Sequence, residues 1–133
     1  MKEVKYIPLD LVRADKNPNI IWKVKDVSQD KRGNVSYRVV AAEDNDAFIY
    51  LYEHQIAPVP LTTEILEKNG WKHACWSRYH KPAETNISLV FYPEVEAFFL
   101  FLYAQEISET PIRYVHQLQH LLFGLGLNHE MDV

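Results

Sequence analysis

Apolar and polar residues alternate with a two-residue period through the first part of the chain. Ile20, Trp22 and Val24 alternate with Lys23 and Lys25. After the turn-forming sequence DKRGN, the same period continues through Val35, Tyr37, Val39 and Ala41. A period of two is typical of strands that bury one face, and a glycine-containing loop between two such strands indicates a hairpin. The pattern therefore predicts two antiparallel strands with their apolar residues on a shared face.

A third strand is expected after the acidic turn EDND. Its sequence AFIYLY is apolar on both faces, with Phe48, Tyr50 and Tyr52 on one face and aliphatic residues on the other. Residues 4–12 supply a candidate fourth strand. Because a short meander gains most by closing on itself, we expect residues 1–58 to form a small curled sheet or an SH3-like barrel.

After Pro58 and Pro60 the pattern changes. The sequence LTTEILEKNGW predicts a short helix that begins after Thr62, whose hydroxyl can accept a hydrogen bond from a helix amide, and ends at Gly70. The sequences WKHACWSRY, NISLVFY and AFFLFLY predict a three-stranded antiparallel sheet. The last of these strands, Ala97 to Tyr103, is apolar on both faces and is expected to lie centrally.

The final helix is predicted to follow Thr110 as N-cap, with Pro111 in its first turn. An apolar stripe with three- and four-residue spacing should lie on the sheet; it consists of Ile112, Val115, Leu118, Leu122 and Leu125. Gly124 or Gly126 is expected to end the helix. The predicted fold is thus α+β in one domain, residues 1–133, with a β-meander over 1–58 and an α+β part over 59–133.

Two segments resemble motifs of a known family. Pro60, Leu61, Thr62, Gly70 and Trp71 match a helix that begins PLTEE and ends at a glycine and an aromatic residue. A terminal helix of the form KYVHQLQNLYFALTG is matched by Tyr114, Val115, His116, Gln117, Leu118, Gln119 and Phe123. Over residues 56–127 the chain therefore resembles a family of small uncharacterised proteins of Bacteroidetes, often found in phage-derived or other mobile segments. The resemblance implies a cytoplasmic accessory protein and brings no catalytic residues.

Composition supports a folded, intracellular protein. The 133 residues include 17 aromatic residues but only 4 glycines, which is incompatible with a disordered chain. The N-terminal sequence lacks the apolar core of a secretory signal, and no run is long enough to span a membrane. The single cysteine, Cys75, agrees with a reducing compartment. We therefore expect a cytoplasmic protein that does not contact a membrane.

Catalytic and metal-binding readings are not favoured. His116 and His120 have the i, i+4 spacing of zinc ligands, but the sequence between them supplies no glutamate base and no third ligand is evident. Cys75 with His73 or His80 is better explained as a small apolar residue in an aromatic strand. The carboxylate pair Glu94 and Glu96 lies at an expected hairpin tip rather than in a cleft. We predict no enzyme, no metal and no cofactor.

Two binding hypotheses remain. In the first, an aromatic-rich sheet or a polar face of the final helix docks a protein partner or a second copy; the residues of that face are His116, Gln117, Gln119 and His120. The alternative is nucleic-acid binding. Residues 1–42 carry a net charge of +4 and residues 43–133 a net charge of −8. The candidate cations are Lys23, Lys25, Lys31, Arg32 and Arg38, with Trp22, Tyr37 and Tyr50 as stacking surfaces. Overall acidity and the inward orientation expected for Trp22 argue against it.

Overall fold

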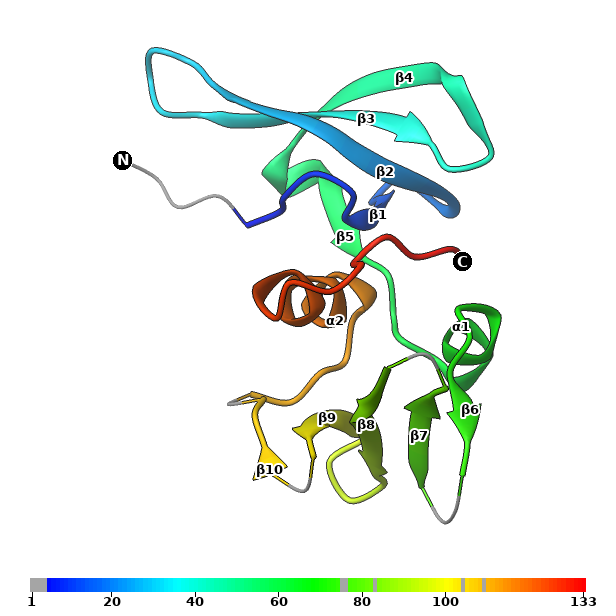
Figure 1. Cartoon of the computed structure of the whole chain (residues 1–133). Helices are drawn as coiled ribbons and strands as arrows, with labels where there is room; N and C mark the ends of the chain where they lie inside the picture. The colour runs from blue at the N-terminus through cyan, green and yellow to red at the C-terminus, as the bar shows by residue number, and fades with distance from the viewer. Residues whose placement is uncertain (1–4, 75–76, 83, 104, 109) are drawn as a thin grey trace.

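The N-terminal half of the chain forms a five-stranded antiparallel sheet, which we call the meander sheet (Figure 1). The computed structural model describes residues 5–74, 77–82, 84–103, 105–108 and 110–133. The strands are β1 (Leu11–Ala14), β2 (Asn17–Gln29), β3 (Val35–Ala41), β4 (Asp44–Tyr52) and β5 (Ile56–Pro58), with a 3-10 turn at Glu53–Gln55. Trp22, Val24, Tyr37 and Val39 are buried on one face. The two-residue period and the hairpin it predicted are therefore confirmed.

The meander sheet is open, so the expectation of an SH3-like barrel is wrong. Its strand order is β4-β3-β2-β1-β5, which places β4 and β5 at opposite edges. After the 3-10 turn the chain crosses to β1, where Ala57 pairs with Arg13 and Pro58 with Val12. This return strand is only three residues long and ends at Pro58, which cannot donate a ladder hydrogen bond. β5 therefore does not pair with β4, and the sheet does not close into a barrel.

The second half of the chain contains its own five-stranded antiparallel sheet, in the order β10-β9-β8-β7-β6. The strands are β6 (Lys72–His73), β7 (Arg78–Lys81), β8 (Glu84–Tyr92), β9 (Ala97–Leu102) and β10 (Gln105–Glu106). Three strands were expected. The prediction of a single strand over WKHACWSRY is wrong, because that segment contributes two strands, β6 and β7, which pair antiparallel with each other. Strand β10, of two residues, is too short to leave a period in sequence. The α+β class and the antiparallel pairing are confirmed.

The short helix α1 (Thr63–Lys68) has the ends that the sequence predicted. The Oγ1 of Thr62 accepts a hydrogen bond from the amide of Ile65 at 3.3 Å. Gly70 takes the left-handed conformation, with φ of 88°, that ends the helix. Leu61 and Leu66 on either side of the cap are both buried.

The final helix, α2 (Val115–Gly124), begins later than predicted. Thr110 and Pro111 do not start it, because Ile112 pairs with Phe98 of β9 in both directions: the amide of each donates to the carbonyl oxygen of the other, at 2.8 and 2.9 Å. Tyr114 is the N-cap residue instead. The predicted apolar stripe is buried through Leu122, whereas Leu125 lies beyond the helix and is 36% exposed.

Helix α2 lies between the two sheets (Figure 1). Val115, Leu118 and Leu122 pack into a core shared with the second sheet, with α1 and with Leu11 of β1. The opposite side of α2 is covered by residues 5–10, which we call the N-terminal arm, and by the C-terminal residues after the helix. The meander sheet has a separate core of its own around Val24, Tyr37 and Val39. No helix in the described part of the chain is long and apolar enough to cross a membrane.

Candidate functional site

The polar face of α2 is largely an internal surface. His116 is 7% exposed and Gln119 is fully buried, so the expectation that these residues form an exposed docking face is wrong for both. The Oε1 of Gln117 accepts hydrogen bonds from the amides of Arg113 and Tyr114, which caps the start of the helix. His120 is partly exposed but is engaged by Asp10. We call the contacts of His116, Gln119 and His120 with the N-terminal arm and β1 the α2 junction.

Gln119 is the centre of the α2 junction. Its Oε1 accepts a hydrogen bond from the amide of Leu11 at 2.9 Å. Its Nε2 donates to the carbonyl oxygen of Leu9 at 2.8 Å and to that of His129 at 2.9 Å. A single side-chain amide thus satisfies backbone groups from three segments that would otherwise be buried without partners.

The histidines of the α2 junction contact buried titratable groups. Asp10 is fully buried; its Oδ2 lies 2.6 Å from Nε2 of His120 and accepts from the amide of Ile7 at 2.9 Å. His116 packs against the ring of Tyr6, with 5.0 Å between centroids. Burial, with smaller contributions from His120 and Lys5, lowers the pKa of His116 to about 4, so the ring is neutral at pH 7. The arrangement fixes the N-terminal arm to α2.

The two histidines considered as partners of Cys75 are not brought together. His73 pairs with Tyr79 and His80 with Lys72, so the two histidines lie on opposite faces of the sheet. Glu94 and Glu96 are exposed in the turn between β8 and β9. Cys75 lies outside the described residues. Among the residues that the structure describes, no group of three or more His, Cys, Asp or Glu is placed to hold a metal ion.

The candidate nucleic-acid residues are dispersed, and two of the cations are paired. The Nζ of Lys23 lies 2.9 Å from Glu130, and the Nε of Arg38 donates to Asp26 at 2.7 Å. Lys25, Lys31 and Arg32 are exposed, the last two at the tip of the β2–β3 hairpin. The expected stacking residues Trp22 and Tyr37 are buried at 9% and 0% exposure, so that part of the hypothesis is wrong. Tyr50 alone of the three is accessible.

The structure shows instead an exposed aromatic row on β4. Phe48, Tyr50 and Tyr52 share the outer face of the meander sheet and are 53%, 64% and 48% exposed, and Ile49 on the inner face is 37% exposed. Phe48 and Tyr50 meet edge to face, with centroids 6.0 Å apart. Arg38 of β3, already held by Asp26, lies over the Phe48 ring. The two apolar faces of AFIYLY were the sequence signal for this surface, although they equally fit a buried strand.

The backbone of β4 also carries hydrogen-bonding groups on its free side. The amide of Tyr52 donates to Oε1 of Gln55 rather than to β3. Phe48, Tyr50 and Tyr52 stand opposite Val40, Arg38 and Ser36 in unbroken register. Because hydrogen-bonded and non-hydrogen-bonded pairs alternate in an antiparallel ladder, the N–H and C=O groups of Phe48 and Tyr50 point away from β3. We call Phe48, Ile49, Tyr50 and Tyr52, with these outward groups, the β4 edge.

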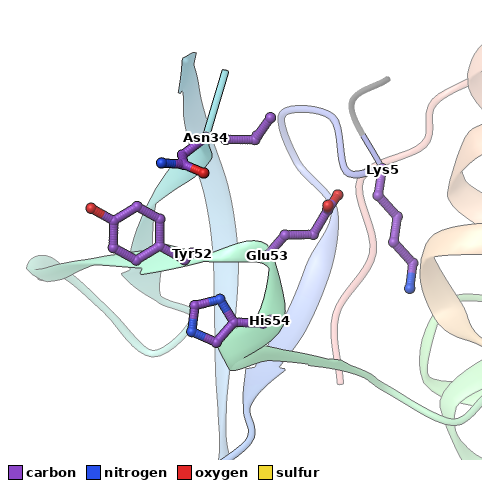
Figure 2. A pocket seen from close by; sticks show the side chains of 6 residues that line it. Lys5, Asn34, Tyr52, Glu53 and His54 are labelled. Atoms are coloured by element: carbon purple, nitrogen blue, oxygen red, sulfur yellow. The ribbon is translucent and has the colours of Figure 1, made fainter. Parts of the chain in front are cut away.

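A polar depression of about 510 Å³ lies where β4 ends. Figure 2 shows the side chains that line it: Lys5, Asn34, Tyr52, Glu53 and His54, with Val35 completing the lining. The hydroxyl of Tyr37 donates to Oε1 of Glu53 at 3.2 Å. Burial raises the pKa of Tyr37, so its hydroxyl keeps its proton and remains a donor. The depression extends the β4 edge with charged groups of both signs.

Comparisons of the chain with protein-family models, with curated proteins and with solved structures found no match.

Proposed function

We propose that the protein is a non-catalytic interaction module that binds an extended protein segment along the β4 edge. The observation that carries the proposal is a nine-residue edge strand with an exposed aromatic row and outward N–H and C=O groups. Adding a strand to such an edge is a common mode of protein recognition: backbone hydrogen bonds supply affinity, and alternate side chains supply specificity.

The other sheet edges support this assignment by contrast. β5 has three residues and ends at Pro58, while β6 and β10 have two residues each. Short strands and prolines are the usual means by which proteins protect an edge from pairing. β4 contains no lysine and no proline, and its pairing with β3 is regular from Phe48 to Tyr52. The start of β4 carries Asp44, Asp46 and a register shift against β3, so the part of the edge without such protection, and suited to a partner strand, is Phe48 to Tyr52.

The side chains of the β4 edge are of the kind that dominate binding energy at protein interfaces. Tyrosine and arginine are enriched among residues whose truncation costs most affinity. Tyr50 is the most exposed residue of the row, and Arg38 beside it is held in place by Asp26, so little side-chain entropy is lost when a partner covers them. The polar residues of α2, in contrast, are used within the chain and are not part of the proposed surface.

The test compares a pair of exposed aromatic residues on β4 with a single exposed aromatic residue elsewhere. Immobilised protein is offered cell extract and, separately, a solution of the same protein, and the bound protein is quantified. Phe48→Ser with Tyr50→Ser should reduce specific binding at least about tenfold, since two hot-spot side chains are removed. The control, Tyr103→Ser, alters a residue that is 72% exposed in the turn after β9, and this variant should bind as the unmodified protein does. Equal binding by all three proteins would reject the β4 edge.

A further inference from the structure

We propose that the segment that pairs with the β4 edge is the β4 strand of a second copy, related by a two-fold axis at Ile49. The inference rests on the proposed function and names its partner. A strand can pair antiparallel with its own copy only if its outward backbone groups, its side chains and its charges are each complementary to themselves after a half-turn. The β4 edge meets the three conditions.

The backbone groups fix the register. Phe48 and Tyr50 direct their N–H and C=O groups outward, and Ile49 between them directs its own toward β3. Antiparallel pairing of two such edges therefore places Phe48 opposite the partner's Tyr50, where each pair exchanges both N–H···O bonds. Ile49 then stands opposite the partner's Ile49 as a non-hydrogen-bonded pair on the two-fold axis.

The side chains fit this register. On the outer face, Phe48 meets the partner's Tyr50, an aromatic cross-strand pair of the kind that stabilises sheets. On the inner face, Ile49, which is 37% exposed, meets the partner's Ile49. A hollow of about 360 Å³ bordered by Ile49, Leu51 and Ala14 lies beside this contact and leaves space for it.

The charges at the two ends of β4 differ in sign. Three exposed acids lie at the start of β4: Glu43 in the β3–β4 turn, and Asp44 and Asp46 in the strand itself. At the opposite end of the sheet, three cations outnumber two acids: Lys31 and Arg32 lie with Asp30 at the β2–β3 turn, and Lys5 lies with Glu53 beside the end of β4. The half-turn brings the acidic end of each copy to the basic end of its partner. Such complementarity favours this register over a shifted one, because shifts would move the opposite charges apart.

The decisive experiment places charges on the two-fold axis. Sedimentation velocity is measured over about 10–500 µM, because a single strand pair is a small interface and is expected to give a weak dimer. The unmodified protein should shift from monomer toward dimer as concentration rises. Ile49→Lys and Ile49→Asp should each remain monomeric, since like charges would face each other on the axis. An equimolar mixture of the two variants should recover dimer to at least the level of the unmodified protein.

Backbone and cross-linking variants check the same register. Tyr50→Pro removes an outward N–H without removing a bond to β3 and should abolish the dimer while the protein stays folded by circular dichroism. In a Cys75→Ser background, Ile49→Cys should form a disulfide-linked dimer on mild oxidation, because a non-hydrogen-bonded pair has Cα atoms about 4.5 Å apart, within disulfide range. Tyr103→Cys in the same background is the control and should stay monomeric.

The outcomes separate this inference from the proposed function. An unmodified protein that stays monomeric at 500 µM, or an Ile49→Lys variant that dimerises normally, overturns the second copy as the partner. In that case, if the unmodified protein captures a protein from extract and the Phe48→Ser, Tyr50→Ser variant does not, the interaction function stands and the partner is a different chain. If that capture is also unchanged, both proposals fail.

Discussion

The α2 junction and the β4 edge show opposite relations between residue type and burial: polar residues are buried at the junction, and aromatic residues are exposed at the edge. At the junction, polar side chains on a helix form internal hydrogen bonds: Gln119 alone joins Leu9, Leu11 and His129. At the edge, apolar side chains on a strand face solvent, with Tyr50 64% exposed. Residue type therefore does not by itself locate a binding surface. A polar residue can be structural when buried backbone groups need a hydrogen-bond partner. An aromatic residue can be exposed when it lies on an edge strand that has no neighbouring strand on one side.

The comparison can be tested with matched pairs of residues, one from each region. The largest effect is expected for aliphatic truncation. Leu118→Ala should lower the free energy of unfolding by about 3–4 kcal/mol, because Leu118 is fully buried and its loss leaves a cavity. Ile49→Ala should cost below about 1 kcal/mol, since Ile49 is already partly exposed. Urea unfolding followed by tryptophan fluorescence measures both. Similar losses would mean that the edge is more tightly packed than the structure indicates.

The amide pair should give the next largest difference. Gln119→Ala removes the partners of Leu11 N–H and Leu9 C=O at a buried site, which should cost about 2–3 kcal/mol. Gln55→Ala removes one acceptor, for the amide of Tyr52, at an exposed site and should cost below about 1 kcal/mol. Hydrogen exchange at the Leu11 amide should accelerate in the Gln119 variant alone. An unchanged Leu11 amide would show that Gln119 does not hold β1.

A smaller effect is expected from pH at the α2 junction. The pKa of His116 is lowered from 6.5 to about 4 in the folded protein, chiefly by burial. Between pH 6.5 and pH 4 the unfolded chain therefore binds a proton at His116 that the folded chain does not bind. The stability that neutral His116 contributes is complete above pH 6.5 and is lost as the pH falls toward 4. Between pH 7 and pH 5, the titration of His116 should lower the free energy of unfolding by about 2 kcal/mol.

His116→Phe should remove that share of the pH dependence of urea unfolding. Tyr6→Phe is the control from the same cluster: burial raises the pKa of Tyr6 to about 12, so its hydroxyl does not titrate in this range and the pH dependence should persist. A His116→Phe variant with the pH dependence of the unmodified protein would contradict the assignment.

Local patterns predicted those elements whose signals are local. The strands of the meander follow the alternation around Trp22 and Tyr37, and α1 follows its cap at Thr62 and its stop at Gly70. The start of α2 was mispredicted because Thr110 and Pro111 are good helix starters, yet the backbone of Ile112 gains two hydrogen bonds by pairing with Phe98. Tertiary pairing outweighed local preference, and no window of sequence around Thr110 contains that information.

The proposed binding surface was predictable only in part. The sequence showed that AFIYLY is apolar on both faces, but whether such a strand is central or lies at an edge depends on where β5 pairs, and β5 pairs with β1. In the same way, the burial of Gln119 depends on segments up to 110 residues away in the chain. The strand prediction for AFIYLY is confirmed, but its place at an edge and the burial of Gln119 were not predictable, because the deciding contacts are distant in sequence and carry no periodic signal.

The hydrogen bonds of Gln119 also set an order of events during synthesis. The N-terminal arm leaves the ribosome long before α2, whose Gln119 is 110 residues further along the chain than Leu9. Until then the carbonyl oxygen of Leu9 and the amide of Leu11 lack their partner Gln119, and β1 lacks the helix that covers Leu11. The three-stranded meander of β2, β3 and β4 needs only segments that are neighbours in sequence and can form first. The nascent chain therefore exposes its aromatic edge strand before its two halves are locked together, and a partner strand can reach β4 while the rest of the molecule is still being made.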